Sequence, residues 1–260
     1  TSGNCKVATF KGPGTFTVNS IGSCAADNLV SYAVVAGGGG SAGDRGGGGG
    51  AGGYREVVSP SSPYTGSPTE GYPTPGNRIT VTATGYPITV GGGGATDNSP
   101  PFTDGAQGAT STFSTIDSAG GGAGHRNTSP GGDGGSGGGA GSIAPHTPRS
   151  GGSGNTPSTT PAQGQDGGDS GNTPPAYTSG GGGGATVAGG NGDIGGDTGG
   201  TGGAGAPTSI PGSPTAYAGG GGGGSDNCGG AGGTGGGGNG GSPPVAGQAG
   251  GDNTGGGAGG

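Results

Sequence analysis

Apolar positions in this chain occur in short runs that lead directly into glycine. Residues 29–36 (Leu-Val-Ser-Tyr-Ala-Val-Val-Ala) are rich in β-branched and aromatic side chains, which favour a β-strand. Without a polar break, the chain then continues into residues 37–53, which are mostly glycine. The pattern predicts a small amount of β-structure joined to much longer glycine segments.

Other apolar runs predict two hairpins near the beginning of the chain. Residues 7–10 and 15–18 are separated by Lys-Gly-Pro-Gly, which suits a chain reversal. Residues 78–84 alternate with period two, and residues 86–90 resume the pattern after one glycine. Two further short strands are expected, at residues 57–58 and 113–116. No segment has the pattern of an α-helix.

The pattern changes after about residue 117. From there, glycine-rich segments alternate with loops of proline, serine and threonine, as in residues 155–161 (Asn-Thr-Pro-Ser-Thr-Thr-Pro). The sequence therefore predicts two domains. Residues 1–116 form a β-strand-rich domain with interspersed glycine runs, and residues 117–260 form an array of glycine segments joined by proline-containing turns.

Composition narrows the structure of the glycine segments. The chain has 85 glycines and 21 prolines in 260 residues, a bias seen in collagen, in disordered segments and in unusual glycine-built solids. Collagen needs glycine at every third position, and runs such as residues 46–50 break that phase. Disordered chains are usually rich in charge, whereas only 8% of these residues are charged. Ordered glycine is the remaining alternative.

Polyglycine type II helices are the form of ordered glycine that this composition predicts. They have three residues per turn and no internal hydrogen bonds, so neighbouring helices must satisfy every N–H and C=O group. The expected fold is mainly β with non-regular structure: a small N-terminal antiparallel β-domain followed by a packed array of polyglycine II helices.

Charge and hydropathy exclude two classes of partner. The net charge is −7, and only seven residues are lysine or arginine, which argues against binding to nucleic acid. No apolar run approaches the roughly 18 residues of a membrane-spanning helix. The chain begins with threonine and shows no signal peptide, so we expect a processed or partial product.

The sequence offers no pattern for catalysis or for a cofactor. Matches to phosphate-binding glycine motifs follow from composition alone, because such loops also need a following helix and usually a lysine. His125 and His146 are the only histidines, and both lie in loops that also carry an arginine. Nothing indicates a positioned base and a rigid pocket. We expect a protein that is not an enzyme and that has no metal and no cofactor.

Loop residues are the candidates for recognition. Tyr64 and Tyr72 lie in the proline-rich loop 59–76, and exposed tyrosines on loops held by a rigid scaffold are common contact residues. The alternative is that they only cover the flanks of the glycine layers. Six residues are the candidate receptor contacts: Tyr64, Tyr72, His125, Arg126, His146 and Arg149.

The three cysteines allow no fully paired monomer. Cys5 and Cys24 flank the first predicted hairpin, where a disulfide would stabilise a tiny sheet and would fit an extracellular setting. The alternative is two unlinked thiols. Cys228 is a free thiol, an intermolecular link or one half of a different pairing.

Several glycine-rich blocks follow one another in order along the chain. They are residues 15–18 (Thr-Phe-Thr-Val), 32–40 (Tyr-Ala-Val-Val-Ala-Gly-Gly-Gly-Gly), 46–54, 88–94, 108–113, 162–168, 217–224 and 249–257. This succession resembles the glycine-rich domain of bacteriophage tail fibres and tail-tip adhesins. The resemblance implies an extracellular virion component in which polyglycine II helices form a sandwich and loops at its tip bind host receptors. Such domains commonly close with an apolar strand, and this sequence stops at Gly260 without one.

Two functions follow as expectations. The first is a phage receptor-binding fibre or adhesin, whose loops contact a glycan or protein on the host surface. The second is a self-assembling extracellular filament subunit, pilus-like and with glycans on its Ser/Thr/Pro loops, in which a neighbouring copy supplies the closing strand. A third, ice- or surface-binding function would require regularly spaced threonines and serines, which the chain lacks.

Overall fold

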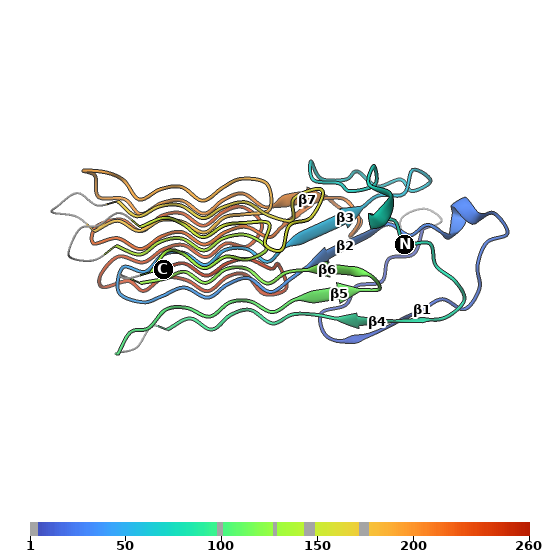
Figure 1. Cartoon of the computed structure of the whole chain (residues 1–260), viewed down its shortest axis with the longest axis horizontal. Coiled ribbons are helices and arrows are strands. Elements are labelled where there is room, and N and C mark those ends of the chain that lie inside the picture. Colours follow the sequence, from blue (N-terminus) through green and yellow to red (C-terminus); the bar gives the residue numbers. More distant parts are fainter. Residues whose placement is uncertain (1–4, 98–100, 127–128, 143–148, 172–176) are drawn as a thin grey trace.

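The computed structural model describes residues 5–97, 101–126, 129–142, 149–171 and 177–260. The molecule is elongated, with its strands gathered at one end and long glycine segments running from them to the other (Figure 1). We call the first the strand end, which holds strands β1 to β8. The second is the distal end, where the turns that contain Asp44, Phe102, Arg126 and Asp226 meet.

The largest sheet has four antiparallel strands in the order β1-β4-β5-β6. These are β1 (Gly14–Thr17), β4 (Gly85–Thr89), β5 (Ser111–Phe113) and β6 (Ile116–Ser118). Phe16 lies opposite Tyr86 in the first pair, and Ile88 lies opposite Phe113 in the second. Ser114 has a positive φ of 55° in the tight turn between β5 and β6. Apolar residues therefore lie opposite one another in both the β1–β4 pair and the β4–β5 pair.

Two smaller antiparallel sheets complete the strand end. Strand β2 (Tyr32–Val35) pairs with β3 (Tyr54–Val57), and β7 (Ala206–Thr208) pairs with β8 (Thr215–Tyr217). The only helices among the described residues are two short 3-10 turns, η1 (Ala25–Asn28) and η2 (Pro75–Asn77). The prediction of a mainly β chain with antiparallel sheets and without an α-helix is confirmed for this part of the chain.

A compact apolar core joins the four-stranded sheet to β2 and β3. Its buried members are Tyr32, Val34, Val57, Ile79, Val81, Phe113 and Ile116. The ring of Phe113 meets the edge or face of Tyr32 and Phe16 at centroid distances of 5.8 and 6.0 Å, in the T-shaped arrangement that aromatic pairs favour. The Tyr32 hydroxyl donates to the Asn77 carbonyl at 2.6 Å, so its polar end is satisfied although the ring is buried.

Both predicted hairpins are wrong in their pairing. Residues 7–10 form no strand, and β1 pairs with β4, about seventy positions later, instead. Residues 78–84 also form no strand, although β4 confirms the second half of that hairpin. Ile79 and Val81 are buried, and Ile79 accepts a hydrogen bond from Val30. The period-two alternation in residues 78–84 therefore reflects the burial of Ile79 and Val81 beside a distant segment. It does not reflect hairpin pairing with residues 86–90.

Two other strand predictions need correction, and one hairpin was missed. Residues 113–116 are not one strand but the turn between β5 and β6. The strand expected at residues 57–58 lies earlier, as β3 (Tyr54–Val57). The hairpin of β7 and β8 was not predicted, because Pro207 and the surrounding glycines are unfavourable for a strand. A two-stranded ribbon has only edge strands, where proline is tolerated.

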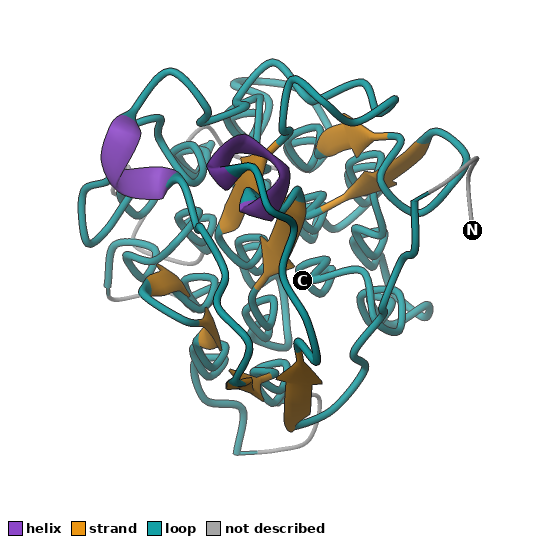
Figure 2. Cartoon of the chain, turned by 90° about the vertical axis from the view of Figure 1, so that its right-hand side faces the viewer, coloured by secondary structure: helices purple, strands orange, loops and turns teal. Residues whose placement is uncertain are grey.

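The glycine segments are held by hydrogen bonds that repeat every three residues. Gly48, Gly49 and Gly50 donate to three different segments, at Gly180, Ala258 and Gly122. The next three residues return to the same three segments, at Gly183, Gly255 and Ala119. Segments far apart in sequence consequently lie side by side, and Figure 2 shows them nearly end on as small coils packed together.

Close approach between backbones explains why these positions are glycine. A Cβ atom on Gly49 would lie 2.1 Å from the carbonyl oxygen of Gly39, and one on Gly257 would lie 1.9 Å from that of Gly49. No side chain fits at such distances. The run 37–53 lies among runs from residues 119–260, and the predicted division at residues 116 and 117 stays a prediction.

Candidate binding surfaces

A cluster of charged and aromatic side chains occupies the distal end. The chain leaves β2, reverses at Asp44 and Arg45, both with positive φ, and returns to β3. Arg126 forms an ion pair with Asp44, and its backbone N–H donates to Asp104 at 2.6 Å. Its guanidinium lies 5.2 Å from the centre of the Phe102 ring, a cation–π contact. Arg126 therefore connects three separate turns.

A second arginine at the distal end, Arg45, also contacts both an aspartate and an aromatic ring. Arg45 forms an ion pair with Asp226, and its guanidinium lies 5.0 Å from the centre of the Tyr177 ring. The side chains in the ion pairs of both arginines are 24% to 32% exposed, so each pair contributes little to stability. Together they fix the positions of the turns and leave charged and aromatic edges open to solvent.

His125 and Arg149 are half-buried residues near the same end. Gly47 donates its N–H to the His125 carbonyl, and the Arg149 N–H donates to the Ser170 hydroxyl at 3.0 Å. Three side-chain nitrogens are buried without a hydrogen-bond partner among the described residues: His125 Nδ1, Arg126 Nε and Arg149 Nε. His146, the remaining candidate of this group, lies outside the described residues.

Tyr64 and Tyr72 lie at the opposite, strand end. Tyr72 packs against the apolar core, and the Arg78 guanidinium lies 4.3 Å from the centre of its ring. Tyr64 is half-buried, and its loop bonds to the segment after β7 through Thr65 and Ser209. The structure therefore divides the five described candidates between the two ends of the molecule: Tyr64 and Tyr72 at the strand end, and His125, Arg126 and Arg149 near the distal end.

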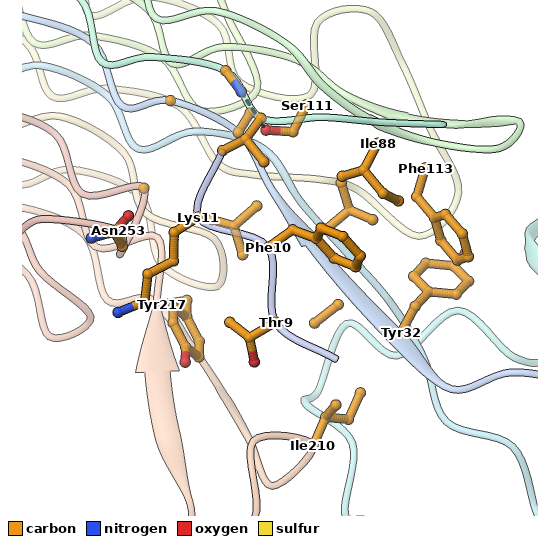
Figure 3. A pocket seen from close by; sticks show the side chains of 18 of the residues that line it. Thr9, Phe10, Lys11, Tyr32, Ile88, Ser111, Phe113, Ile210, Tyr217 and Asn253 are labelled. Carbon is orange, nitrogen blue, oxygen red and sulfur yellow. Dashed lines mark hydrogen bonds between the residues drawn. The ribbon is translucent and has the colours of Figure 1, made fainter. Parts of the chain in front are cut away.

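A large groove of about 1110 Å³ lies beside the strand end (Figure 3). The segment of residues 5–13 lines one part of it. Residues 37–39 and 91–96 line another part mostly with backbone, beside the run 249–256, which adds Asp252 and Asn253. Lys11 reaches toward Tyr217 and Asn253 there. The Gly91 N–H donates to the Ser111 hydroxyl at 2.9 Å at its margin. The groove could not be predicted from local patterns, because its walls come from many segments that are distant in the sequence.

A buried carboxylate was also missed. Glu56 in β3 is 2% exposed and accepts hydrogen bonds from the Ser67 N–H and the Thr208 hydroxyl. Burial raises the pKa of the neighbouring Tyr54 hydroxyl, and the charge of Glu56 raises it further. Glu56 thus connects β3, the loop 59–76 and β7. No local sequence pattern predicts this role.

The three cysteines are free thiols in the structure. Cys5 is half-buried beside Tyr64, whereas Cys24 and Cys228 are exposed. The expected disulfide between Cys5 and Cys24 is therefore not formed here, and it stays a prediction. Within the described ranges no group of three or more histidine, cysteine or acidic side chains could hold a metal ion, and no helix is long and apolar enough to span a membrane.

Comparison with known proteins identifies the chain at the level of a family. The family model of the glycine-rich domain matches residues 11–260. The chain belongs to the glycine-rich domain family. No curated protein and no solved structure matches this glycine-rich domain. The match includes all ten helices and strands of the described structure, together with both ends that carry the candidate contacts.

Proposed function

We propose that this glycine-rich domain is a non-enzymatic, extracellular scaffold that presents its distal turns to a receptor on a host cell. The single observation that carries this function is the three-residue hydrogen-bond period of the glycine runs. It is the period of polyglycine II helices, whose N–H and C=O groups are satisfied by their neighbours. A scaffold of that kind holds short connecting turns rigidly, and turns on rigid scaffolds are common binding sites.

The distal end is the better candidate for the contact surface. Arg126, Arg45 and their aromatic partners combine cationic and flat apolar groups, which suit both glycans and proteins. At the strand end, Tyr72 is largely engaged with Arg78 and the core. The resemblance to phage tail-fibre and tail-tip adhesin domains points to the surface of a bacterial host, and to a virion fibre as the location.

A cell-binding assay tests this proposal. The fluorescently labelled chain would be incubated with a panel of bacterial cells, beside the variants Arg126→Ala and Arg78→Ala. Because Arg126 connects three distal turns, its loss should abolish binding. Arg78 lies at the strand end and its replacement should leave binding unchanged. Equal loss in both variants, or no binding by the original chain, would contradict the proposed adhesive tip.

Self-assembly into a filament is the alternative function. Its support is the edge of the glycine array, where runs such as residues 91–96 keep unpaired backbone groups that another chain could use. Negative-stain electron microscopy of the purified chain, with and without reductant, separates the two functions. Compact particles favour the adhesin. Long uniform fibres favour the filament, and their loss under reductant would implicate the cysteines.

A further inference from the structure

One run in the centre of the glycine array has every side occupied by neighbouring backbone. The run of residues 46–53 is hydrogen-bonded to six other segments, through Gly39, Gly122, Gly139, Gly180, Gly221 and Ala258. Every N–H group from Gly47 to Tyr54 donates to a carbonyl of another segment. The run 46–53 is therefore the reference for a segment that is surrounded on all six sides.

The adjacent run of residues 37–41 has only five such neighbours. They are reached through Gly50, Gly94, Ala109, Gly121 and Ala258. Gly38 is buried, yet its N–H has no acceptor among the described residues, while the amides of Gly37, Gly39 and Gly40 all donate. A buried N–H without a partner costs about 1–3 kcal/mol. The sixth side of this run is therefore unfilled.

The groove lies on that sixth side. Residues 37–39 line it together with two flanking runs, residues 91–96 and 249–256 (Figure 3). The run 91–96 presents glycine backbone and small side chains without a charged residue, whereas the run 249–256 adds Asp252 and Asn253 to the wall. Gly93 has neither its N–H nor its carbonyl paired with another described residue, and the Gly92 N–H is also unpaired.

Glycine at the groove is not explained by the chain itself. A Cβ on Gly92 would meet nothing within 4 Å, and one on Gly93 would meet only a single atom at 3.7 Å. The neighbouring edge run behaves differently, because its two glycines, Gly105 and Gly108, each face a backbone atom at 2.0 to 2.4 Å. Its other positions carry side chains: Ala106, Gln107, Ala109 and Thr110. Positions 92 and 93 are thus glycine although the structure has room for a side chain at both.

We propose that the groove binds an extended, glycine-rich segment of a different polypeptide, which completes the sixth side of the run 37–41. Such a segment would accept from the Gly38, Gly92 and Gly93 amides, and only glycine permits the close backbone approach seen elsewhere in the array. A second folded copy is a poorer fit, because its inner runs are already engaged and its unpaired backbone groups lie on the groove run 91–96 itself. This proposal concerns a partner at the side of the array and is independent of the distal receptor surface.

A soluble peptide tests the proposal directly. It repeats residues 46–53 (Gly-Gly-Gly-Gly-Gly-Ala-Gly-Gly) between lysines, and the control peptide has alanine at every position of that stretch. The ¹⁵N-labelled full chain would be titrated with each peptide and followed by NMR. We expect saturable shifts at Gly38, Gly92 and Gly93 with the glycine peptide only, and slower hydrogen exchange at these amides. Absence of these changes would overturn the proposal.

Two variants separate docking from folding. Gly92→Val fills the groove at a position with free space, and we expect it to weaken peptide binding by about tenfold or more. Ala109→Val makes a comparable change at an exposed position outside the groove and should bind as the original chain does. Thermal unfolding verifies that both variants fold. Equal binding by all three chains, or concentration-dependent dimerisation without peptide that Gly92→Val abolishes, would contradict the assignment of this partner.

Discussion

The backbone N–H of Gly49 donates to the carbonyl oxygen of Ala258 at 2.7 Å. This bond joins the run after β2 to the last glycine run of the chain, and Ala258 is itself buried. The Gly49 carbonyl in turn lies close to the backbone of Gly257, since a Cβ on Gly257 would be 1.9 Å from the Gly49 carbonyl oxygen. The first and last thirds of the sequence therefore form one packed array.

Alanine substitutions of glycine should have opposite effects inside the array and at its edge. Gly257→Ala forces a methyl group into the neighbouring backbone, and overpacking of this kind destabilises by about 1–3 kcal/mol or more. Gly92→Ala meets no atom within 4 Å and lowers the entropy of the unfolded chain, which stabilises by about 0.4–1 kcal/mol. Chemical denaturation of the two variants measures both changes. A similar effect of both substitutions would contradict the packing described.

A buried glutamine should be essential to the junction between strands and glycine runs. Gln163 is 1% exposed; its Oε1 accepts from the Ala119 N–H at 2.8 Å, and its Nε2 donates to the Pro157 carbonyl at 2.7 Å. Gln163→Leu leaves both groups unpaired, at a cost of about 1–3 kcal/mol each. Gln107→Leu, at an exposed position, is the matched control. Equal unfolding free energies for the two variants would show that the buried network is not needed.

Stability should fall at alkaline pH. Burial raises the pKa of Tyr32 and of Tyr54 above the ordinary value of 10.0. Above pH 10 the unfolded chain therefore releases protons that the folded chain retains, which favours unfolding. Well below pH 10 both tyrosines are neutral in both states and the effect vanishes. Urea unfolding at pH values on either side of 10 measures this, and stability that is constant or increases would contradict the burial of both hydroxyls.

A half-buried tyrosine with an exposed hydroxyl provides an internal control for that experiment. The Tyr86 hydroxyl lies 3.2 Å from the Thr82 hydroxyl and accepts from the Thr82 N–H at 2.8 Å, and these bonds lower its pKa. Replacement of Tyr86 by phenylalanine should therefore leave the alkaline loss of stability in place. Replacement of Tyr32 by phenylalanine should reduce it.

Local patterns in the sequence predicted the kind of structure better than its connections. The apolar run around Tyr32 and the alternation around Ile88 both mark real strands, because side-chain burial leaves a local pattern. The choice of pairing partner leaves no local pattern. Strands β1 and β4 are far apart in the sequence, and the packing of the whole core determines their register. The Arg126–Asp44 ion pair spans 82 positions, and the groove is built from many segments distant in the sequence, so neither could be found from local patterns.

The sequence also predicted ordered glycine from composition and low charge, whereas it could not say which runs are neighbours. A uniform glycine segment has no side chains by which one partner is distinguished from another. The turns and the residues at the ends of runs, such as Gln163 and Ser142, supply that information through specific side-chain contacts. Gln163 lies where a strand-end segment meets the array, and its role became evident only from its hydrogen bonds.

The central claim is that the glycine runs form one ordered, mutually hydrogen-bonded array. Through-hydrogen-bond scalar couplings, measured by NMR on the ¹³C,¹⁵N-labelled chain, test it most directly. We expect couplings from the amides of Gly48, Gly49 and Gly50 to the carbonyls of Gly180, Ala258 and Gly122. Absence of these couplings, with glycine amides that exchange as fast as those of an unfolded chain, would contradict the account.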